Sequence, residues 1–157
     1  MTSQRALDAQ DLATLGRNHD ALLTLCLKLE EIADSLPFDI DEDLCREVAQ
    51  SVTPLLRQTQ QLEERVLFPD FDRSAGSCFA AMMIERLKGE HRFDGLAAEE
   101  ISLTLKAMIE GRCRLSFDTV GYMLRGFFEC IRRHVAAEKL MIEALCVAEA
   151  EGREILM

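Results

Sequence analysis

The chain has 157 residues, of which 48% are hydrophobic and 29% are charged, and its formal net charge is −10 at pH 7. This length predicts one domain with a single core. The acidic balance argues against nucleic acid as a partner, since phosphate binding needs a basic face. No apolar run marks a secretory signal or a membrane span. We therefore expect a cytoplasmic protein with no membrane partner, one domain over residues 1–150 and a C-terminal tail over residues 151–157.

The first predicted helix covers approximately residues 8–36. Its apolar positions recur at alternating spacings of three and four, which is typical of the buried stripe of a helix in a bundle. His19 is the only strongly polar member of this stripe. The stripe contains Leu12, Leu15, His19, Leu22, Cys26, Leu29, Ala33 and Leu36.

The second predicted helix covers residues 42–69. Its inward frame contains Val52, Leu56, Thr59, Glu63 and Val66, whereas the neighbouring frame is polar throughout and indicates the solvated face. Glu63 is therefore predicted to point inward, rather than its neighbour Glu64. Pro54 lies within this run and predicts a kink or a break. The segment from Pro69 to Gly76 is expected to end the helix.

The third and fourth predicted helices, residues 78–110 and 115–148, carry interrupted stripes of the same kind. Polar residues replace apolar ones at His91 and Asp94 in the third, and at His134 and Glu138 in the fourth. The third stripe contains Ile84, Leu87, His91, Asp94, Ala98, Ile101, Leu105 and Met108, and the fourth Phe117, Val120, Leu124, Phe127, Ile131, His134, Glu138, Met141 and Leu145. The long runs rich in Leu, Ala and Glu predict an all-α, up-down antiparallel four-helix bundle.

The polar stripe residues indicate a metal site in the bundle core. A buried carboxylate is costly unless it is paired or bound to a cation, and a His and a Glu four residues apart point the same way. At about 1.5 Å of rise per residue, His19, Glu63, His91, His134 and Glu138 fall in one slab about two turns thick. A satisfied His–Glu pair inside the bundle is the alternative interpretation.

Several other kinds of site are excluded because their sequence motifs are absent. The sequence has no HExxH zinc protease motif, no ExxH of the ferritin-like di-iron plan, no phosphate loop and no GxSxG elbow. Its six cysteines include no CxxC pair and are expected to be free thiols in a reducing compartment. Most are interpreted as small hydrophobic residues, with a redox role near the metal for Cys130 or Cys26 as the minority interpretation.

Taken together, these segments resemble the hemerythrin-like, or HHE cation-binding, domain family. The matching segments are Asn18-His19-Asp20, Glu63 to Pro69, Glu90-His91-Arg92 and His134 to Glu138. The resemblance covers residues 12–147 and implies a four-helix bundle around a non-haem di-iron centre. It implies iron ligation by His19, Glu63, His91, His134 and Glu138, with both carboxylates bridging the irons.

The sequence departs from this family at one ligand. The family usually has a His four residues before the carboxylate of its second helix, where this chain has Thr59 followed by Gln60. Thr is a poor iron ligand and Gln a weak one. Water or a small ligand can fill the gap, Asp94 can supply an oxygen, or one metal position is lost, which leaves a mononuclear or metal-free bundle.

Two function classes follow from this reasoning. In the first, an iron site with an open position binds O2, NO or peroxide, or senses iron or redox state, inside an apolar sleeve of Leu15, Leu22, Leu87, Phe127 and Ile131. In the second, the bundle is a structural or interaction protein that has lost full di-iron capacity. Catalytic turnover is not indicated, because no separate acid–base set is recognisable.

Overall fold

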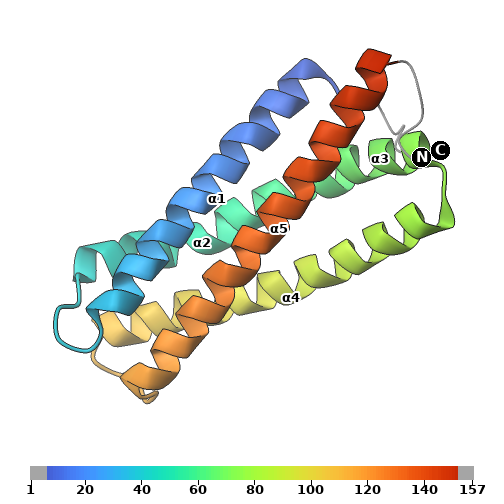
Figure 1. The fold of residues 1–157 in the computed structure, drawn as a ribbon. Coiled ribbons are helices and arrows are strands. Elements are labelled where there is room, and N and C mark those ends of the chain that lie inside the picture. The colour runs from blue at the N-terminus through green and yellow to red at the C-terminus, as the bar shows by residue number, and fades with distance from the viewer. Residues whose placement is uncertain (1–6, 152–157) are drawn as a thin grey trace.

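Four long helical segments lie side by side along the length of the molecule (Figure 1). The structure is a computed structural model that describes residues 7–151, over which all regular structure is helical. The elements are α1 (Ala9–Ser35), α2 (Glu42–Leu62), the π-helix η1 (Glu63–Leu67), α3 (Phe68–Ala75), α4 (Cys78–Ile109) and α5 (Phe117–Glu151). The part of the expected C-terminal tail beyond Glu151 lies outside the described residues.

The helices begin and end at residues whose chemistry suits those positions. Side-chain oxygens of Asp8, Asp41 and Ser77 each accept a hydrogen bond from a backbone N–H three residues further on, at the starts of α1, α2 and α4. Such caps satisfy N–H groups that have no partner within the helix. Gly76 follows α3 at φ 58°, a left-handed conformation that glycine adopts without a steric penalty. The connections between consecutive long segments are short, and these segments run antiparallel (Figure 1).

The second long segment is continuous from α2 through η1 to α3, which corrects two expectations. The helix does not break at Pro54, which lies inside α2 between the buried residues Val52 and Leu56. Nor does it end at Pro69, which lies at the start of α3, where a proline needs no N–H. The five-residue π-helix that precedes α3 shifts the inward face of the segment from Glu63 onward.

The bundle has a simple up-down order. α1 packs against α2 and α5, and α4 packs against the same two helices, so that α1 and α4 are diagonal partners (Figure 1). The predicted all-α four-helix bundle is thereby confirmed over residues 7–151.

The core consists of two apolar clusters with a polar layer between them. One cluster includes Leu22 on α1 and Val135 on α5, and the other includes Leu15 on α1 and Met141 on α5. His19 lies between the clusters along α1, and Glu138 lies between them along α5. The same division holds on the second segment, between Leu56 and Leu67, and on α4, between Leu87 and Ala98. Polar groups in such a layer must satisfy one another or a ligand.

The burial of the predicted stripes agrees with the sequence at most positions but not at Phe117. Its residue surface is 45% exposed, because it is the first residue of α5 and lies at the end of the bundle. Three phenylalanines outside the predicted stripes differ in burial: Phe71 is buried, whereas Phe79 and Phe93 are exposed on α4.

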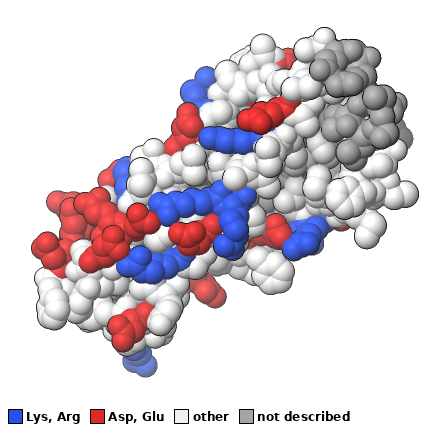
Figure 2. All heavy atoms as spheres, in the orientation of Figure 1, with Lys and Arg blue, Asp and Glu red and all other residues white. Residues whose placement is uncertain are grey.

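Charged side chains of both signs alternate over the face shown in Figure 2. Ion pairs join α1 to α5 at Arg125 and Asp34, 2.6 Å apart, and at Arg132 and Glu30, 3.0 Å apart. Such exposed pairs contribute at most about 1 kcal/mol each. Among the described helices, none has a stretch long and apolar enough to cross a bilayer.

Candidate metal centre

Four of the predicted site residues meet in the polar layer, one from each long segment. His19 comes from α1, Glu63 is the first residue of η1, His91 comes from α4 and Glu138 from α5. None is more than 5% exposed. Glu64, in contrast, has a side chain that is 38% exposed, so Glu63 is the inward carboxylate as predicted.

The two imidazoles and the two carboxylates form a closed ring of alternating nitrogen and oxygen ligands. His19 Nε2 lies 3.1 Å from Glu63 Oε1 and 3.3 Å from Glu138 Oε2. His91 Nε2 lies 3.1 Å from Glu63 Oε2 and 3.0 Å from Glu138 Oε1. Each carboxylate therefore directs one oxygen to each imidazole. We refer to these four residues as the core quartet.

Neighbouring contacts fix the orientation of His91. The ring of Phe68 stacks on the imidazole with centroids 5.4 Å apart, and the Gln60 side-chain amide donates to the His91 backbone carbonyl at 3.0 Å. Both contacts come from the second helical segment, on either side of Glu63. The π-turn that begins at Glu63 therefore lies where His91 is positioned, and such turns are frequent at functional sites.

The pKa shifts of the quartet indicate that both imidazoles are protonated when no metal ion is bound. Burial alone lowers the pKa of His19, but hydrogen bonds with Glu138 and Glu63 outweigh it and raise the pKa to about 9. The same balance raises the pKa of His91 to about 10. Burial raises the pKa of Glu63, whereas the hydrogen bonds with both imidazoles overcome burial and lower the pKa of Glu138. The imidazoles are thus held in the charged form by the carboxylates between them.

Hydrogen bonds between the imidazoles and the carboxylates do not satisfy every polar atom of the quartet. His19 Nδ1, His91 Nδ1 and Glu63 Oε2 are buried and have no hydrogen-bond partner among residues 7–151. Although Glu63 Oε2 is 3.1 Å from His91 Nε2, that nitrogen is hydrogen-bonded to Glu138 Oε1. One N–H cannot serve two carboxylates fully, whereas a cation accepts several oxygen and nitrogen ligands at once. The donor set and the unsatisfied oxygen therefore fit a bound metal ion.

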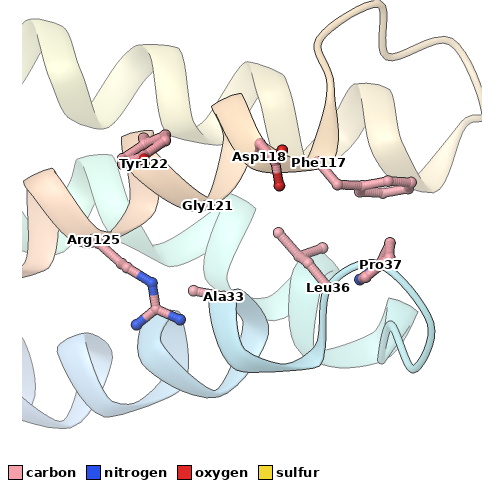
Figure 3. A pocket seen from close by; sticks show the side chains of 8 residues that line it. All are labelled: Ala33, Leu36, Pro37, Phe117, Asp118, Gly121, Tyr122 and Arg125. Atoms are coloured by element: carbon pink, nitrogen blue, oxygen red, sulfur yellow. The ribbon is translucent and has the colours of Figure 1, made fainter.

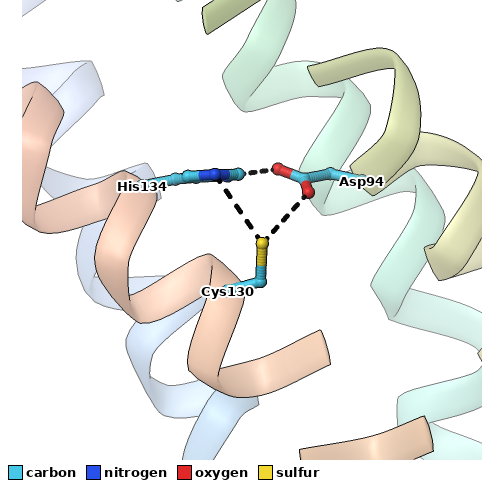
Figure 4. Close-up of side chains that lie close together, drawn as sticks. All are labelled: Asp94, Cys130 and His134. Carbon is cyan, nitrogen blue, oxygen red and sulfur yellow. Dashed lines mark hydrogen bonds and ion pairs between the residues drawn. The ribbon is translucent and has the colours of Figure 1, made fainter. Parts of the chain in front are cut away.

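His134 lies in a second group, adjacent to the quartet. Its Nδ1 atom is 2.5 Å from Asp94 Oδ2, and its Nε2 atom is 3.0 Å from Glu90 Oε2. The thiol of Cys130 lies close to Asp94 and His134, with Sγ 3.6 Å from Asp94 Oδ1 and 3.7 Å from His134 Nε2 (Figure 4). Burial and the carboxylate of Asp94 raise the pKa of the Cys130 thiol. Glu138, one turn beyond His134, instead contacts the imidazoles of the quartet.

A small cavity of about 10 Å³ joins the two groups. Its lining includes Glu63, His91 and Glu138 from the quartet, together with Asp94 and His134 from the second group. Thr59 and Gln60 also line it, as do four apolar side chains: Leu22, Leu56, Ile131 and Val135. The Thr59 hydroxyl donates to the backbone carbonyl of Leu55 at 2.8 Å and so remains bonded within its own helix.

A surface pocket at the end of the bundle is remote from these polar groups. It has a volume of about 470 Å³ and lies where the end of α1 meets the start of α5, with Pro37, Tyr122 and Arg125 among its lining residues (Figure 3). No member of the quartet or of the second group lines it.

Glu90 and Cys130 also contact the candidate site, although the sequence indicated this only weakly. Glu90 was expected only as the neighbour of His91 in a motif, yet it contacts His134. Cys130 precedes His134 by one helical turn, and this spacing was the available signal for their contact. All six cysteines are free thiols, as predicted.

Comparison with known proteins agrees with this arrangement. A family model described as the hemerythrin HHE cation binding domain matches residues 10–146. No curated protein and no solved structure gives a significant match to the chain. The matched range contains all of α2, η1, α3 and α4, most of α1 and α5, and every residue of both polar groups. The chain thus belongs to the hemerythrin HHE cation-binding domain family.

Proposed function

We propose that this protein binds non-haem iron at the core quartet and presents it to a small diatomic ligand or peroxide. The observation that carries this proposal is the closed ring in which Glu63 and Glu138 each direct one oxygen to His19 and one to His91. A carboxylate that spans two imidazoles in this way is suited to bridge two metal ions capped by those imidazoles.

The ligand types favour iron within this fold. Imidazole and carboxylate ligands suit iron, and facing helices of a bundle are an established place for di-iron carboxylate sites. Bound iron would supply exchangeable coordination positions and a change of oxidation state. His134 also lines the cavity and is the fifth proposed ligand, which makes a di-iron centre the preferred stoichiometry.

The surroundings of the site favour a small ligand. The cavity of about 10 Å³ has room for approximately one water-sized molecule, so an organic substrate does not fit. Leu22, Leu56 and Ile131 exclude bulk water from its apolar side. The Thr59 hydroxyl is bonded to its own helix, which leaves a coordination position to water or to the incoming ligand. We therefore propose reversible binding or sensing of O2, NO or peroxide, or of iron and redox state, rather than turnover.

A second candidate function follows from the same observation on Thr59. If no other group replaces the missing imidazole, one metal position is weak, and the protein is a mononuclear or metal-free structural bundle. The number of irons bound per chain distinguishes the two candidates.

The test is anaerobic addition of NO to protein that has been loaded with ferrous iron. We expect new visible absorption bands that saturate at no more than one NO per iron and disappear when argon removes NO. Iron-loaded Glu63→Gln protein should lose most of this response, because one bridging carboxylate is absent. An iron-loaded protein whose spectrum does not change with NO would overturn the proposal of an open coordination position.

A further inference from the structure

We propose that Asp94, Cys130 and His134 form a second metal position in which Cys130 supplies a thiolate ligand. This inference deepens the proposed function, on which it rests for the presence of a metal centre in the adjacent quartet. As the sulfur–metal bond forms, the proton of the Cys130 thiol leaves to solvent.

The spacing of Cys130 from Asp94 and from His134 matches a metal's coordination shell. One ligand atom from each residue lies within 4.8 Å of the other two. Metal–ligand bonds of about 2.0–2.3 Å in a tetrahedron give ligand–ligand separations of about 3.3–3.8 Å. The two separations from Cys130 Sγ fall within this range, at 3.6 Å to Asp94 Oδ1 and 3.7 Å to His134 Nε2.

The side chains are already oriented for this role. Asp94 Oδ2 is bonded to His134 Nδ1, which turns the other ring nitrogen toward the thiol (Figure 4). Cys130 and His134 lie one turn apart on α5 and Asp94 lies on α4, so a metal here would join two helices. Glu90 Oε2, 3.0 Å from His134 Nε2, offers a fourth ligand atom.

The position is close to the quartet but chemically distinct from it. Asp94 and His134 line the same small cavity as Glu63 and Glu138, which places the two groups on either side of one space. The quartet offers only nitrogen and oxygen, whereas this group adds a sulfur. A thiolate, an imidazole and a carboxylate together suit a borderline divalent ion such as Zn²⁺ or Fe²⁺. His134 is 15% exposed and Cys130 is half-buried, so an ion can enter from this side.

Cobalt provides a direct test, because Co²⁺ bound to a thiolate gives a near-ultraviolet charge-transfer band that nitrogen and oxygen ligands do not give. Metal-free, reduced protein is titrated with Co²⁺ alone, and the band and the bound cobalt are measured together. We expect the band in the parent chain and its loss in Cys130→Ser. Cys113→Ser is the matched control, since Cys113 is also half-buried but lies in the connection between α4 and α5. It should retain the band.

The outcomes separate this inference from the proposed function. Bound cobalt without a thiolate band, or a band that survives in Cys130→Ser, overturns the inference and leaves the quartet site standing. If Glu63→Gln and Glu138→Gln leave cobalt binding unchanged and the band persists, the thiolate position is supported and the quartet site is contradicted. Absence of bound cobalt overturns both. Asp94→Asn is the second variant, and it should shift or weaken the band while Cys130 is still present.

Discussion

His19 Nε2 lies 3.1 Å from Glu63 Oε1, although the two residues are 44 positions apart in the chain. This contact joins α1 to the π-turn of the second helical segment and is fully buried. A charged imidazole beside a carboxylate in an apolar core is a weak source of stability, because the desolvation of both groups offsets much of their attraction. We therefore propose that the pair is two ligands held in place for a cation.

Replacement of Glu138 by Gln should sharply reduce metal binding. The amide keeps the size of the side chain but removes the charge and the two-oxygen contact with His19 and His91. Loss of groups that merely orient a ligand costs about 10–100-fold in affinity, so loss of the ligand itself should cost at least about 10-fold. Metal analysis after dialysis measures this effect. Glu143→Gln, an exposed change on the same helix, should keep the metal content of the parent.

The stability of the metal-free protein should fall as the pH rises above neutrality. The pKa values of His19 and His91 are about 9 and about 10 in the folded chain, compared with 6.5 for an unperturbed histidine. The folded state therefore holds these protons more tightly, so their stabilising effect is complete below pH 6.5 and is lost as the pH rises through 9 and 10.

Urea unfolding in the presence of a chelator, at several pH values between about 6 and 10, measures this dependence. The metal-loaded protein should show a flatter profile, because the ion replaces the imidazole protons. His91→Gln should also flatten the metal-free profile. A metal-free stability that stays constant or increases over this range would contradict the assignment of protons to the quartet.

Introduction of an imidazole at Thr59 should strengthen metal binding at the cavity. Thr59 is 1% exposed, lines the cavity and donates its hydroxyl only to Leu55, so its replacement removes no contact with the quartet. Thr59→His should therefore raise iron occupancy under limiting iron, with a control of Thr59→Val. Unchanged occupancy in the histidine variant would show that another side chain already fills this coordination position.

The apolar cluster on one side of the polar layer should account for much of the fold's stability. Leu29 is fully buried on α1, whereas Leu27, two residues earlier, is 60% exposed. Leu29→Ala should lower the free energy of unfolding by about 2–5 kcal/mol, through lost burial and a residual cavity. Leu27→Ala should change it by less than about 0.5 kcal/mol. Equal effects of the two substitutions in urea unfolding would show that the helix is packed in a different register.

The fold and the quartet were predictable because they depend on helical periodicity. His19, His91 and Glu138 each replace an apolar residue in a stripe of alternating three and four spacings, and they are buried at those positions. The choice of Glu63 over Glu64 followed from the polar frame around Glu64 and is confirmed by their exposure. Periodicity predicts which face of a helix is buried, and short connections predict which helices are neighbours.

The remaining features depend on contacts between helices or on local changes of helix type. The register between α4 and α5 decides that His134 contacts Glu90 and Asp94 rather than the quartet, and no single stripe contains that information. The π-turn after Glu63 allows the second segment to continue beyond Pro69, whereas the proline alone indicated an end. Pro54 similarly has buried neighbours that keep α2 continuous.

The most direct test of the account is the amount of iron bound by the parent chain under anaerobic, reducing conditions with excess ferrous iron, followed by dialysis. We predict approximately two irons per chain, with a higher melting temperature than the metal-free protein because the ion binds only the folded state. A protein that retains no iron, and that melts at the same temperature with and without ferrous iron, would contradict the assignment of the quartet as a metal centre.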